Sequence, residues 1–234
     1  MSSNLGYLAL RLRGPLQSWG FDSQFNRRST GLMPTKSGIA GMCCAALGYS
    51  RGSNEELEFL TEFRKVKMTS IAIPIFQRSK WDESVKELSV GRLQDYHTVQ
   101  NTRRANGKIN DNCVLTHRQY LTDAAFGIVL GGSLEHLTGI SVALADPQWG
   151  VWLGRKSCIP STPVLAGISE SADSAYKLLI GDESIEFYTR QVEVDDFADG
   201  IDSILDQAGT FDVDKRATEF SPRRVRLIQG RINS

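Results

Sequence analysis

The segment Pro34-Thr35-Lys36-Ser37-Gly38-Ile39-Ala40-Gly41 decides the start of the fold, because it opens a helix whose first turn is suited to an anion. Apolar residues recur at helical spacing over residues 36–47 and predict an amphipathic helix there. Thr35 occupies the N-cap position, and Gly48 ends the helix. The first turn therefore offers free N–H groups, a lysine, a hydroxyl and a glycine that lets a ligand approach closely.

Three interpretations of this helix start are open at first. Lys36-Ser37 has the ending of a nucleotide-binding P-loop, but that motif has glycine at positions 30 and 35, and both are threonine here. Pro34 also removes an N–H that a phosphate cradle would use. The P-loop is thus disfavoured. A capped core helix and a phosphate site for a polymer such as RNA both remain.

The surrounding chain predicts alternating α and β elements. We expect strands at 7–13, 68–76, 118–130, 151–153 and 163–168, and helices at 55–63 and 133–145. The order βααβ, insertion, βαβ predicts an α+β fold of the ferredoxin-like (RRM-like) kind over residues 1–167. We expect residues 168–234 to form a small C-terminal β-rich region, with strands at 185–194 and 224–228 and an acidic loop at 195–214.

The insertion at about 77–117 is far longer than an ordinary connection. Residues 93–99 are β-prone, and Asn106-Gly107 is a strong hairpin signal. The basic residues Arg103 and Arg104 lie beside that turn. We interpret the insertion as a protruding basic β-hairpin, with a solvated flexible loop as the alternative.

Net charge is zero, yet the charges are unevenly distributed. Residues 1–120 carry 17 Lys/Arg against 10 Asp/Glu, whereas residues 168–214 carry 2 against 13. Such asymmetry is typical of nucleic-acid binders whose overall pI conceals the basic part. No apolar run is long enough to span a membrane and no secretory signal is visible, so we expect a cytoplasmic protein. Four cysteines without a CxxC pair fit a reducing compartment.

Candidate catalytic groups are few. Cys113 and His117 share a local spacing, but no second Cys/His pair exists, so we expect no metal and no cofactor. A metal-independent ribonuclease needs only a His, Lys or Tyr beside a ribose hydroxyl, and Tyr96, His97 and His117 are available for that role.

Binding residues are better supported. Several cations lie on or near predicted turns and suit phosphate contacts, and two aromatic residues near them could stack on unpaired bases, although Trp19 is equally suited to be a core anchor. The residues are Arg11, Arg13, Arg27, Arg28, Lys36, Arg155 and Lys156 for phosphates, and Trp19 and Tyr96 for bases.

Five motifs follow one another along the chain: Leu12–Gly20, Pro34–Gly38, Asp95–Val99, Tyr120–Ala124 and Leu153–Cys158. In this order they resemble one known family. The chain is similar to the CasD-type subunits of type I-E CRISPR Cascade complexes (Cas family number five, RAMP superfamily), and the resemblance runs from about Leu8 to Leu165.

The resemblance implies a ferredoxin-like domain with a protruding thumb, and an RNA-binding role without catalysis. Such a subunit binds the 5′ handle of the crRNA and caps the backbone filament in antiviral defence. Implied partners are the crRNA, the Cascade backbone subunit, the large subunit, and target DNA near the PAM end. By resemblance, the phosphate contacts are Lys36, Ser37, Arg155 and Lys156, the residues near handle bases are Gln17 and Trp19, and the thumb cations are Arg103 and Arg104.

Two alternatives stay open beside this function. Relatives in type I-C systems cut RNA with a Tyr, a Lys and a His, the last two adjacent, but this chain has no Lys–His neighbour pair. That difference favours a binder over a metal-independent endoribonuclease that processes CRISPR repeat RNA. A protein-interaction module whose acidic 168–214 segment binds a basic partner is the other alternative.

Overall fold

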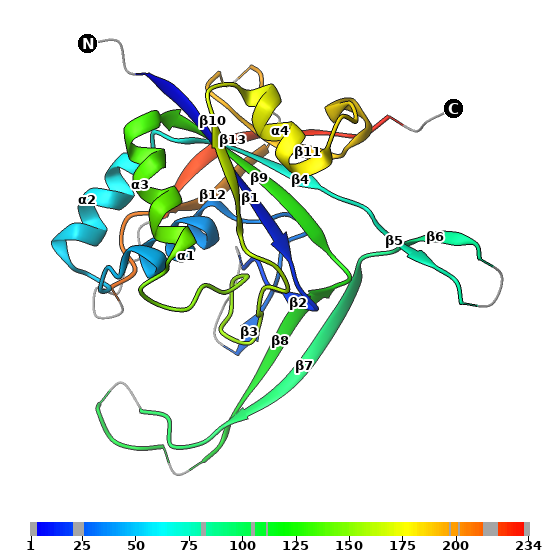
Figure 1. Cartoon of the computed structure of the whole chain (residues 1–234). Coiled ribbons are helices and arrows are strands. Elements are labelled where there is room, and N and C mark those ends of the chain that lie inside the picture. The colour runs from blue at the N-terminus through cyan, green and yellow to red at the C-terminus, as the bar shows by residue number, and fades with distance from the viewer. Residues whose placement is uncertain are drawn as a thin grey trace.

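The structure, a computed structural model, describes residues 4–20, 26–80, 83–103, 106–110, 112–196, 198–200, 202–212 and 220–231. Its elements form a compact body with two arms (Figure 1). The helices are α1 (Lys36–Leu47), α2 (Asn54–Phe63), α3 (Leu134–Ala145), α4 (Ala172–Ile180) and the short 3-10 helix η1 (Ile185–Phe187). The strands are β1 (Leu5–Arg13), β2 (Leu16–Gln17), β3 (Arg27–Arg28), β4 (Lys67–Ala72), β5 (Ile75–Arg78), β6 (Val85–Leu88), β7 (Gly91–Val99), β8 (Val114–Thr122), β9 (Ala125–Ser133), β10 (Leu165–Ser169), β11 (Arg190–Val194), β12 (Asp202–Ala208) and β13 (Phe220–Ile228).

The main sheet has seven strands in the order β10-β1-β9-β4-β11-β13-β12, and every neighbouring pair is antiparallel. β1 and β9 pair along their whole length, from Leu5 opposite Ser133 to Arg13 opposite Ala125. The predicted mixture of helices and strands is confirmed, and the main sheet is antiparallel. β10 spans the predicted boundary after residue 167, and the C-terminal strands extend the same sheet; the division into two domains stays a prediction.

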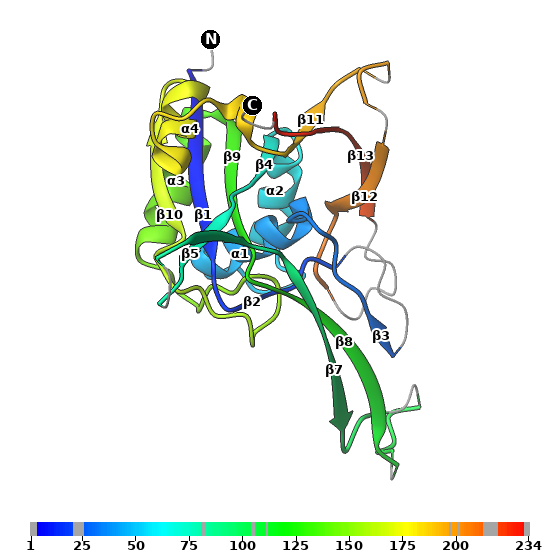
Figure 2. The same cartoon turned by 90° about the vertical axis from the view of Figure 1, so that its right-hand side faces the viewer.

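Helices cover both faces of the sheet (Figures 1 and 2). On one face, the alternate β1 residues Leu8, Leu10 and Leu12 are fully buried in the core that also contains residues of α1, α2 and α3. On the other face, Ala9 lies in a smaller core with Ala175 of α4. Side chains of a strand point alternately to its two faces, so β1 contributes to both cores.

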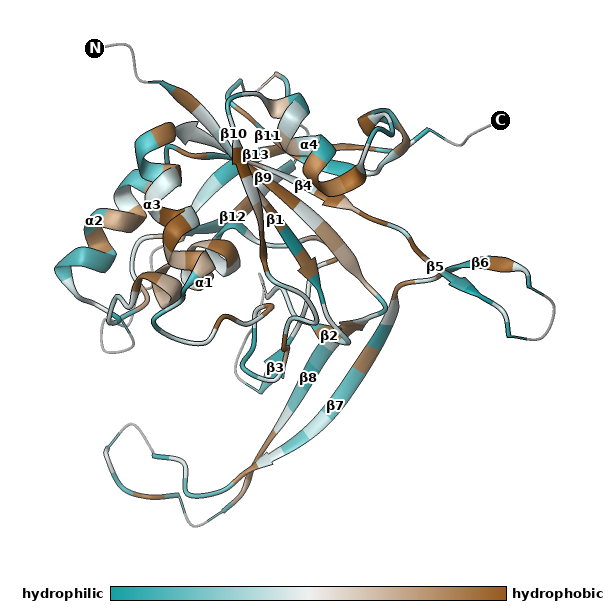
Figure 3. Cartoon of the chain, viewed as in Figure 1, coloured by the Kyte–Doolittle hydropathy of each residue, from teal (hydrophilic) through white to brown (hydrophobic). Residues whose placement is uncertain are grey.

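The predicted insertion consists of two hairpins rather than one. The short β5–β6 hairpin and the long β7–β8 ribbon project in different directions (Figures 1 and 2). The ribbon pairs from Gly91 opposite Thr122 to Val99 opposite Val114, and Figure 3 shows hydrophilic residues along much of it. Asp123, with φ 54°, separates β8 from β9. The single strand predicted over 118–130 is therefore wrong, because the chain turns there from the ribbon into the main sheet.

Two further expectations are corrected. The acidic stretch 195–214 contains strand β12, whose pairing with β13 buries Asp206. Residues 151–153, expected as a strand, belong to a turn in which Leu153 N donates to Cys158 O. Helices α1, α2 and α3 agree closely with their predicted ranges. No helix of the described residues is long and apolar enough to cross a bilayer.

Candidate nucleic-acid interface

Backbone N–H groups at the start of α1 already have hydrogen-bond acceptors within the protein. The Thr35 hydroxyl accepts a hydrogen bond from Gly38 N, and the Lys36 N–H donates to Asp206 Oδ2 at 2.8 Å. Gly38 does not make room for a ligand, since a Cβ there would lie 3.0 Å from the Trp19 ring. The helix N-terminus predicted to hold a phosphate thus already has a carboxylate from β12 as its anion.

Lys36 is buried, with 1% of its surface exposed. Its Nζ donates to Glu193 Oε1 at 2.9 Å and to Arg64 O at 3.1 Å. Burial lowers the pKa of the Lys36 ammonium, and Glu193 opposes that shift. This burial corrects the expected phosphate contact, because the ammonium is paired inside the protein and does not reach the surface.

Asp206 and Glu193 extend this pairing into a four-residue network. Arg223 donates to both Asp206 oxygens, at 2.6 and 2.9 Å, and its Nη1 lies 3.8 Å from Glu193. Glu193 also accepts from Met68 N. The two cations and two carboxylates are all buried. The network therefore fastens the start of α1 to β11, β12 and β13.

A cleft of about 680 Å³ opens beside α1. Four basic side chains from three separate segments meet at it, together with residues of α1 and several aromatic rings. Its charged and hydroxyl lining comprises Arg28, Arg51, Arg155, Lys156, Ser18, Thr35, Ser37 and Glu56, and its aromatic lining comprises Tyr49, Trp149, Trp152, Phe211 and Phe220. The cleft thus combines cations with rings, the pairing that suits phosphates and bases of a single strand.

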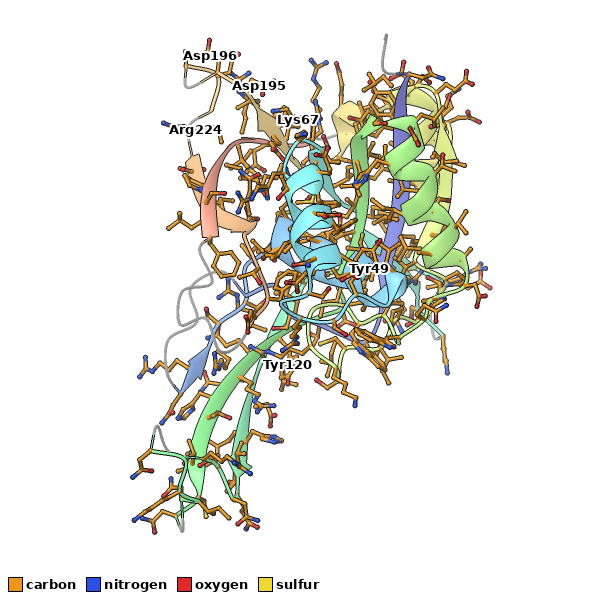
Figure 4. All side chains as sticks on the ribbon, turned by 90° about the vertical axis from the view of Figure 1, so that its left-hand side faces the viewer. Tyr49, Lys67, Tyr120, Asp195, Asp196 and Arg224 are labelled. Atoms are coloured by element: carbon orange, nitrogen blue, oxygen red, sulfur yellow. The ribbon has the colours of Figure 1, made fainter. Side chains whose placement is uncertain are left out.

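Arg155 is the cation that the protein itself holds in place. Its guanidinium donates to Gln119 O and Arg28 O and lies 4.9 Å from the Tyr120 ring centroid. Figure 4 places Tyr120 at the root of the β7–β8 ribbon. The preceding Gly154 has φ 96°, so the turn that presents Arg155 needs a residue without a side chain there.

The Glu56 carboxylate is hydrogen-bonded to two segments that line the cleft, so it is not available to a ligand. Its Oε2 accepts hydrogen bonds from Gly52 N, Thr210 Oγ1 and Phe211 N. The Arg51–Gly52 turn and Phe211 are thereby held together. By contrast, no ion pair within the described part of the chain involves Arg28, Arg51 or Lys156.

Gln17 and Trp19 lie in the core rather than on a base-binding surface. Both are 0% exposed. The Gln17 amide donates to Leu12 O and Ala124 O, and its oxygen accepts from the Trp19 indole N–H at 3.1 Å. The expected contact with handle bases is therefore corrected, and the core-anchor alternative describes Trp19.

The remaining predicted cations are dispersed. Arg11 lies on the α4 side of the sheet, where its Nη2 donates to Leu178 O. Arg27 and Arg28 form the exposed strand β3, which pairs parallel with His117 and Arg118 of β8. The structure thus brings Arg28, Ser37, Arg155 and Lys156 to the cleft and leaves Arg11 away from it.

The residues expected to act on RNA lie along the β7–β8 ribbon. The Tyr96 and His117 rings meet edge to face with centroids 5.0 Å apart, and His117 Nδ1 lies 3.3 Å from Gln94 Nε2. His97 lies on the opposite face of β7, with Nδ1 3.9 Å from Asp95 Oδ2. Arg103 is exposed near the tip of the ribbon, where its backbone forms an isolated β-bridge with Ile109. Arg104 lies outside the described residues.

The family model described as CRISPR-associated protein (Cas_Cas5) matches residues 7–226. The chain belongs to this family. One curated relative, the CRISPR system Cascade subunit CasD of Escherichia coli (strain K12), is 32% identical over 180 residues, which cover 74% of this chain and 75% of the relative.

Two solved structures show that the family resemblance extends to the fold. A chain of a CRISPR RNA-guided surveillance complex superposes with a TM-score of 0.69 at 26% identity, covering 95% of this chain and 89% of that one. A crystal structure of a Cas protein superposes with a TM-score of 0.62 at 27% identity, covering 95% of both chains. The antiparallel sheet and its helices are therefore shared with Cas proteins.

Sequence reasoning missed part of the cleft. Tyr49 and Arg51 come directly after the end of α1 and line the cleft. The segment Gly48–Gly52, in which an aromatic and a basic residue lie between two glycines, could have indicated them. Trp149 and Trp152 enclose a glycine in the segment that leads to Arg155. Both segments combine aromatic and flexible residues beside a cation, a pattern that suits base stacking.

Proposed function

We propose that this chain is the non-catalytic RNA-binding subunit of a CRISPR surveillance complex and holds the 5′ handle of the crRNA in the cleft beside α1. The observation that carries the proposal is the meeting of Arg28, Arg51, Arg155 and Lys156 with aromatic rings in one cleft. Cations bind phosphates of any sequence, and rings stack on unpaired bases. The family and the named relatives supply the CRISPR context.

The cleft favours an unpaired strand over a duplex. Trp149 is 48% and Phe220 is 42% exposed, so flat apolar surface is available where bases are splayed out. Single-stranded RNA is recognised in this way, with rings stacked on bases and cations on the backbone. A handle cut from a repeat is such a strand, and we infer that its backbone follows the cations along the cleft.

A binding role fits the placement of the histidines. None of the described cleft-lining residues is a histidine. His97 and His117 lie on the ribbon, and His136 packs on Phe59 with ring centroids 5.5 Å apart. Acid–base cleavage of RNA needs a His, Lys or Tyr at the ribose hydroxyl. Of these residue types the described cleft lining holds Tyr49 and Lys156 but no histidine, and its side chains chiefly supply positive charge and stacking surface.

The proposal also covers fold type and assembly. The order β10-β1-β9-β4, with α1 between β1 and β4 in the chain and α3 between β9 and β10, supports a ferredoxin-like core. We propose the β7–β8 ribbon as the thumb, through which the subunit caps the backbone filament. Contacts with the backbone subunit, the large subunit and target DNA near the PAM end follow from the same role, as does a place in the cytoplasm.

Binding of labelled repeat RNA at several salt concentrations tests the function. Each phosphate contact on a single strand contributes about −0.7 to the slope of log affinity against log salt. Arg28, Arg51, Arg155 and Lys156 together give a slope of about −2.8, or about a 50-fold loss of affinity between about 50 and 200 mM salt. Lys156→Ala or Arg51→Ala makes the slope shallower, at about −2.1, which corresponds to about an 18-fold loss.

Lys177→Ala is the matched control, because Lys177 is an exposed lysine on α4, away from the cleft-lining residues. It leaves both affinity and slope unchanged. If Lys156→Ala, Arg51→Ala and Lys177→Ala bind RNA with equal affinity, the cleft is not the RNA-binding surface.

A second function has one observation in its favour. Exposed Tyr96 and half-buried His117 form a ring pair on the ribbon, where an imidazole lies close to solvent. That arrangement suits a metal-independent endoribonuclease that processes repeat RNA. The same RNA, incubated without metal, decides between the two functions: specific cutting that His117→Ala abolishes would establish the enzyme, and intact RNA supports the binder.

A further inference from the structure

Arg155 lies where the RNA cleft meets the root of the β7–β8 ribbon. Its side chain lines the cleft. Its Nη1 donates to Gln119 O of β8 at 3.0 Å, and its Nη2 donates to Arg28 O of β3 at 2.8 Å. The guanidinium carbon lies 4.9 Å from the ring centroid of Tyr120, the next residue of β8. One side chain therefore joins the cleft to two strands at the ribbon root.

The ribbon is attached to the body of the protein by short ladders. β8 pairs with β2 through two residue pairs and with β3 through two more. From His117 to Val114, the described part of β8 pairs only with β7. The strand from Gln119 to Cys113 spans roughly 20 Å, at about 3.4 Å per residue, so a turn of about 15° at the root moves Cys113 by about 5 Å. Small changes at the root are thus amplified along the ribbon.

The Arg155 guanidinium can contact RNA without giving up its bonds at the ribbon root. It carries five N–H donors, and the bonds to Gln119 and Arg28 use two of them. The other three suit a phosphate, because the donors of a planar guanidinium keep fixed directions and bonds from a charged donor are strong. When the ribbon turns at its root, Gln119 O moves with it and the guanidinium loses its alignment. RNA therefore binds best to one ribbon direction.

We propose that Arg155 is a positioning residue that fixes the direction of the β7–β8 ribbon when RNA occupies the cleft. The inference rests on the proposed function, in which the cleft binds RNA and the ribbon meets the backbone filament. A phosphate on the three other N–H groups holds the guanidinium in place, and the guanidinium holds Gln119 O and Arg28 O. The subunit is thereby prepared to cap a filament once it carries RNA.

Pulsed electron–electron double resonance between two spin labels measures the ribbon direction in the full chain. Cys113 is exposed beside the far end of β8, whereas the other three cysteines are buried, so Cys113 takes one label. Val142→Cys provides the second site, because Val142 is 67% exposed on α3. With Arg155 in place, we expect saturating repeat RNA to narrow the distribution of label distances by about twofold.

Arg155→Lys separates positioning from charge. Lysine keeps the positive charge but lacks the planar pair of Nη groups that reaches both carbonyl oxygens. We expect this variant to bind RNA with the wild-type salt slope and to keep a broad distance distribution when RNA is bound. Arg155→Met also keeps the broad distribution, and its salt slope is shallower by about 0.7 because a cation is lost. Thermal unfolding checks that each variant is folded at the temperature of the measurement.

Arg190→Lys is the matched control. Arg190 likewise donates to two backbone carbonyls, those of Ile185 and Tyr188, but it belongs to β11 and is not among the described cleft-lining residues. RNA narrows the distance distribution in this variant as it does in the wild type. A merely structural role of Arg155 would instead broaden the distribution equally with and without RNA.

The proposal is wrong if RNA still narrows the distribution in Arg155→Lys, or if Arg190→Lys loses the narrowing as well. A wild-type distribution that bound RNA leaves unchanged would also overturn it. RNA binding is measured in the same samples. A wild-type chain that does not bind RNA would overturn the proposed function, so the two failures are distinguishable.

Discussion

Replacement of Lys36 by methionine tests whether this lysine serves in the buried ion pair with Glu193 or contacts a phosphate of the RNA. The substitution keeps the length and apolar stem of the side chain but removes the charge that faces Glu193 at 2.9 Å. Glu193 then retains only the Met68 N–H and the more distant Arg223 Nη1, at 3.8 Å. Removing one partner of a buried pair costs about 3–5 kcal/mol. For a chain of this size that corresponds to a fall in Tm of about 6–20 °C.

Thermal unfolding followed by circular dichroism measures the fall, and RNA affinity is measured well below Tm. The double variant Lys36→Met/Glu193→Gln recovers part of the stability, because a neutral amide still accepts from Met68 N without leaving a buried charge. Lys67→Met is the control, since Lys67 pairs with Asp195 at the surface, and exposed pairs contribute little. Figure 4 shows Lys67 and Asp195 together, far from Tyr120.

An unchanged Tm combined with a salt slope reduced by about 0.7 would refute this reasoning. That pair of results would mean that Lys36 leaves its buried partners and contacts a phosphate, as the sequence predicts. We expect the opposite pair: a large loss of stability and an RNA affinity close to that of the wild type.

Three other perturbations give outcomes with clear signs. Burial lowers the pKa of His136, which stacks on Phe59, so the unfolded chain takes up its proton near pH 6.5 while the folded chain resists it. Stability therefore falls as pH drops below about 6.5, and urea unfolding at two pH values shows a smaller fall in His136→Gln. A Cβ added at Gly154 would lie 1.8 Å from Ser18 O, so Gly154→Ala costs about 3 kcal/mol or more in urea unfolding and weakens RNA binding through Arg155. Gly139→Ala, in open space on α3, stabilises the protein by about 0.5–1 kcal/mol, and a lower Tm would contradict that expectation.

Local signals predicted the elements well because local interactions determine them. The N-cap of α1 at Thr35 and its C-cap at Gly48 each make their capping contacts within the adjacent turn of the helix, and both were predictable from residue types. The break at Asp123 was not, since a positive φ at aspartate is decided by where the ribbon meets the sheet. β12 was missed for a related reason: its acidic residues predict a loop, but Asp206 is neutralised by Arg223 from another strand.

The candidate site was predicted only in part. Arg155 and Lys156 were found because a glycine precedes two cations, a local pattern. Lys36 and Trp19 have the residue types of RNA contacts, yet the Lys36 ammonium is paired with Glu193, 157 residues later in the chain, and Trp19 is buried in the main core. Whether a polar residue faces solvent depends on the tertiary structure, and a single sequence does not contain that information in local form.

The ion network at the start of α1 also sets an order of events during synthesis. Lys36 and its partner Glu193 are 157 residues apart, and Asp206 follows Lys36 by 170. At about 5–20 residues per second, a ribosome needs roughly 8 to 30 seconds to make that stretch. Throughout this interval the Lys36 ammonium lacks its carboxylate and stays hydrated. Helix α1 can therefore dock fully on the sheet only when the last strands arrive, so a chain truncated before β11 would expose an unfinished core to aggregation and proteolysis.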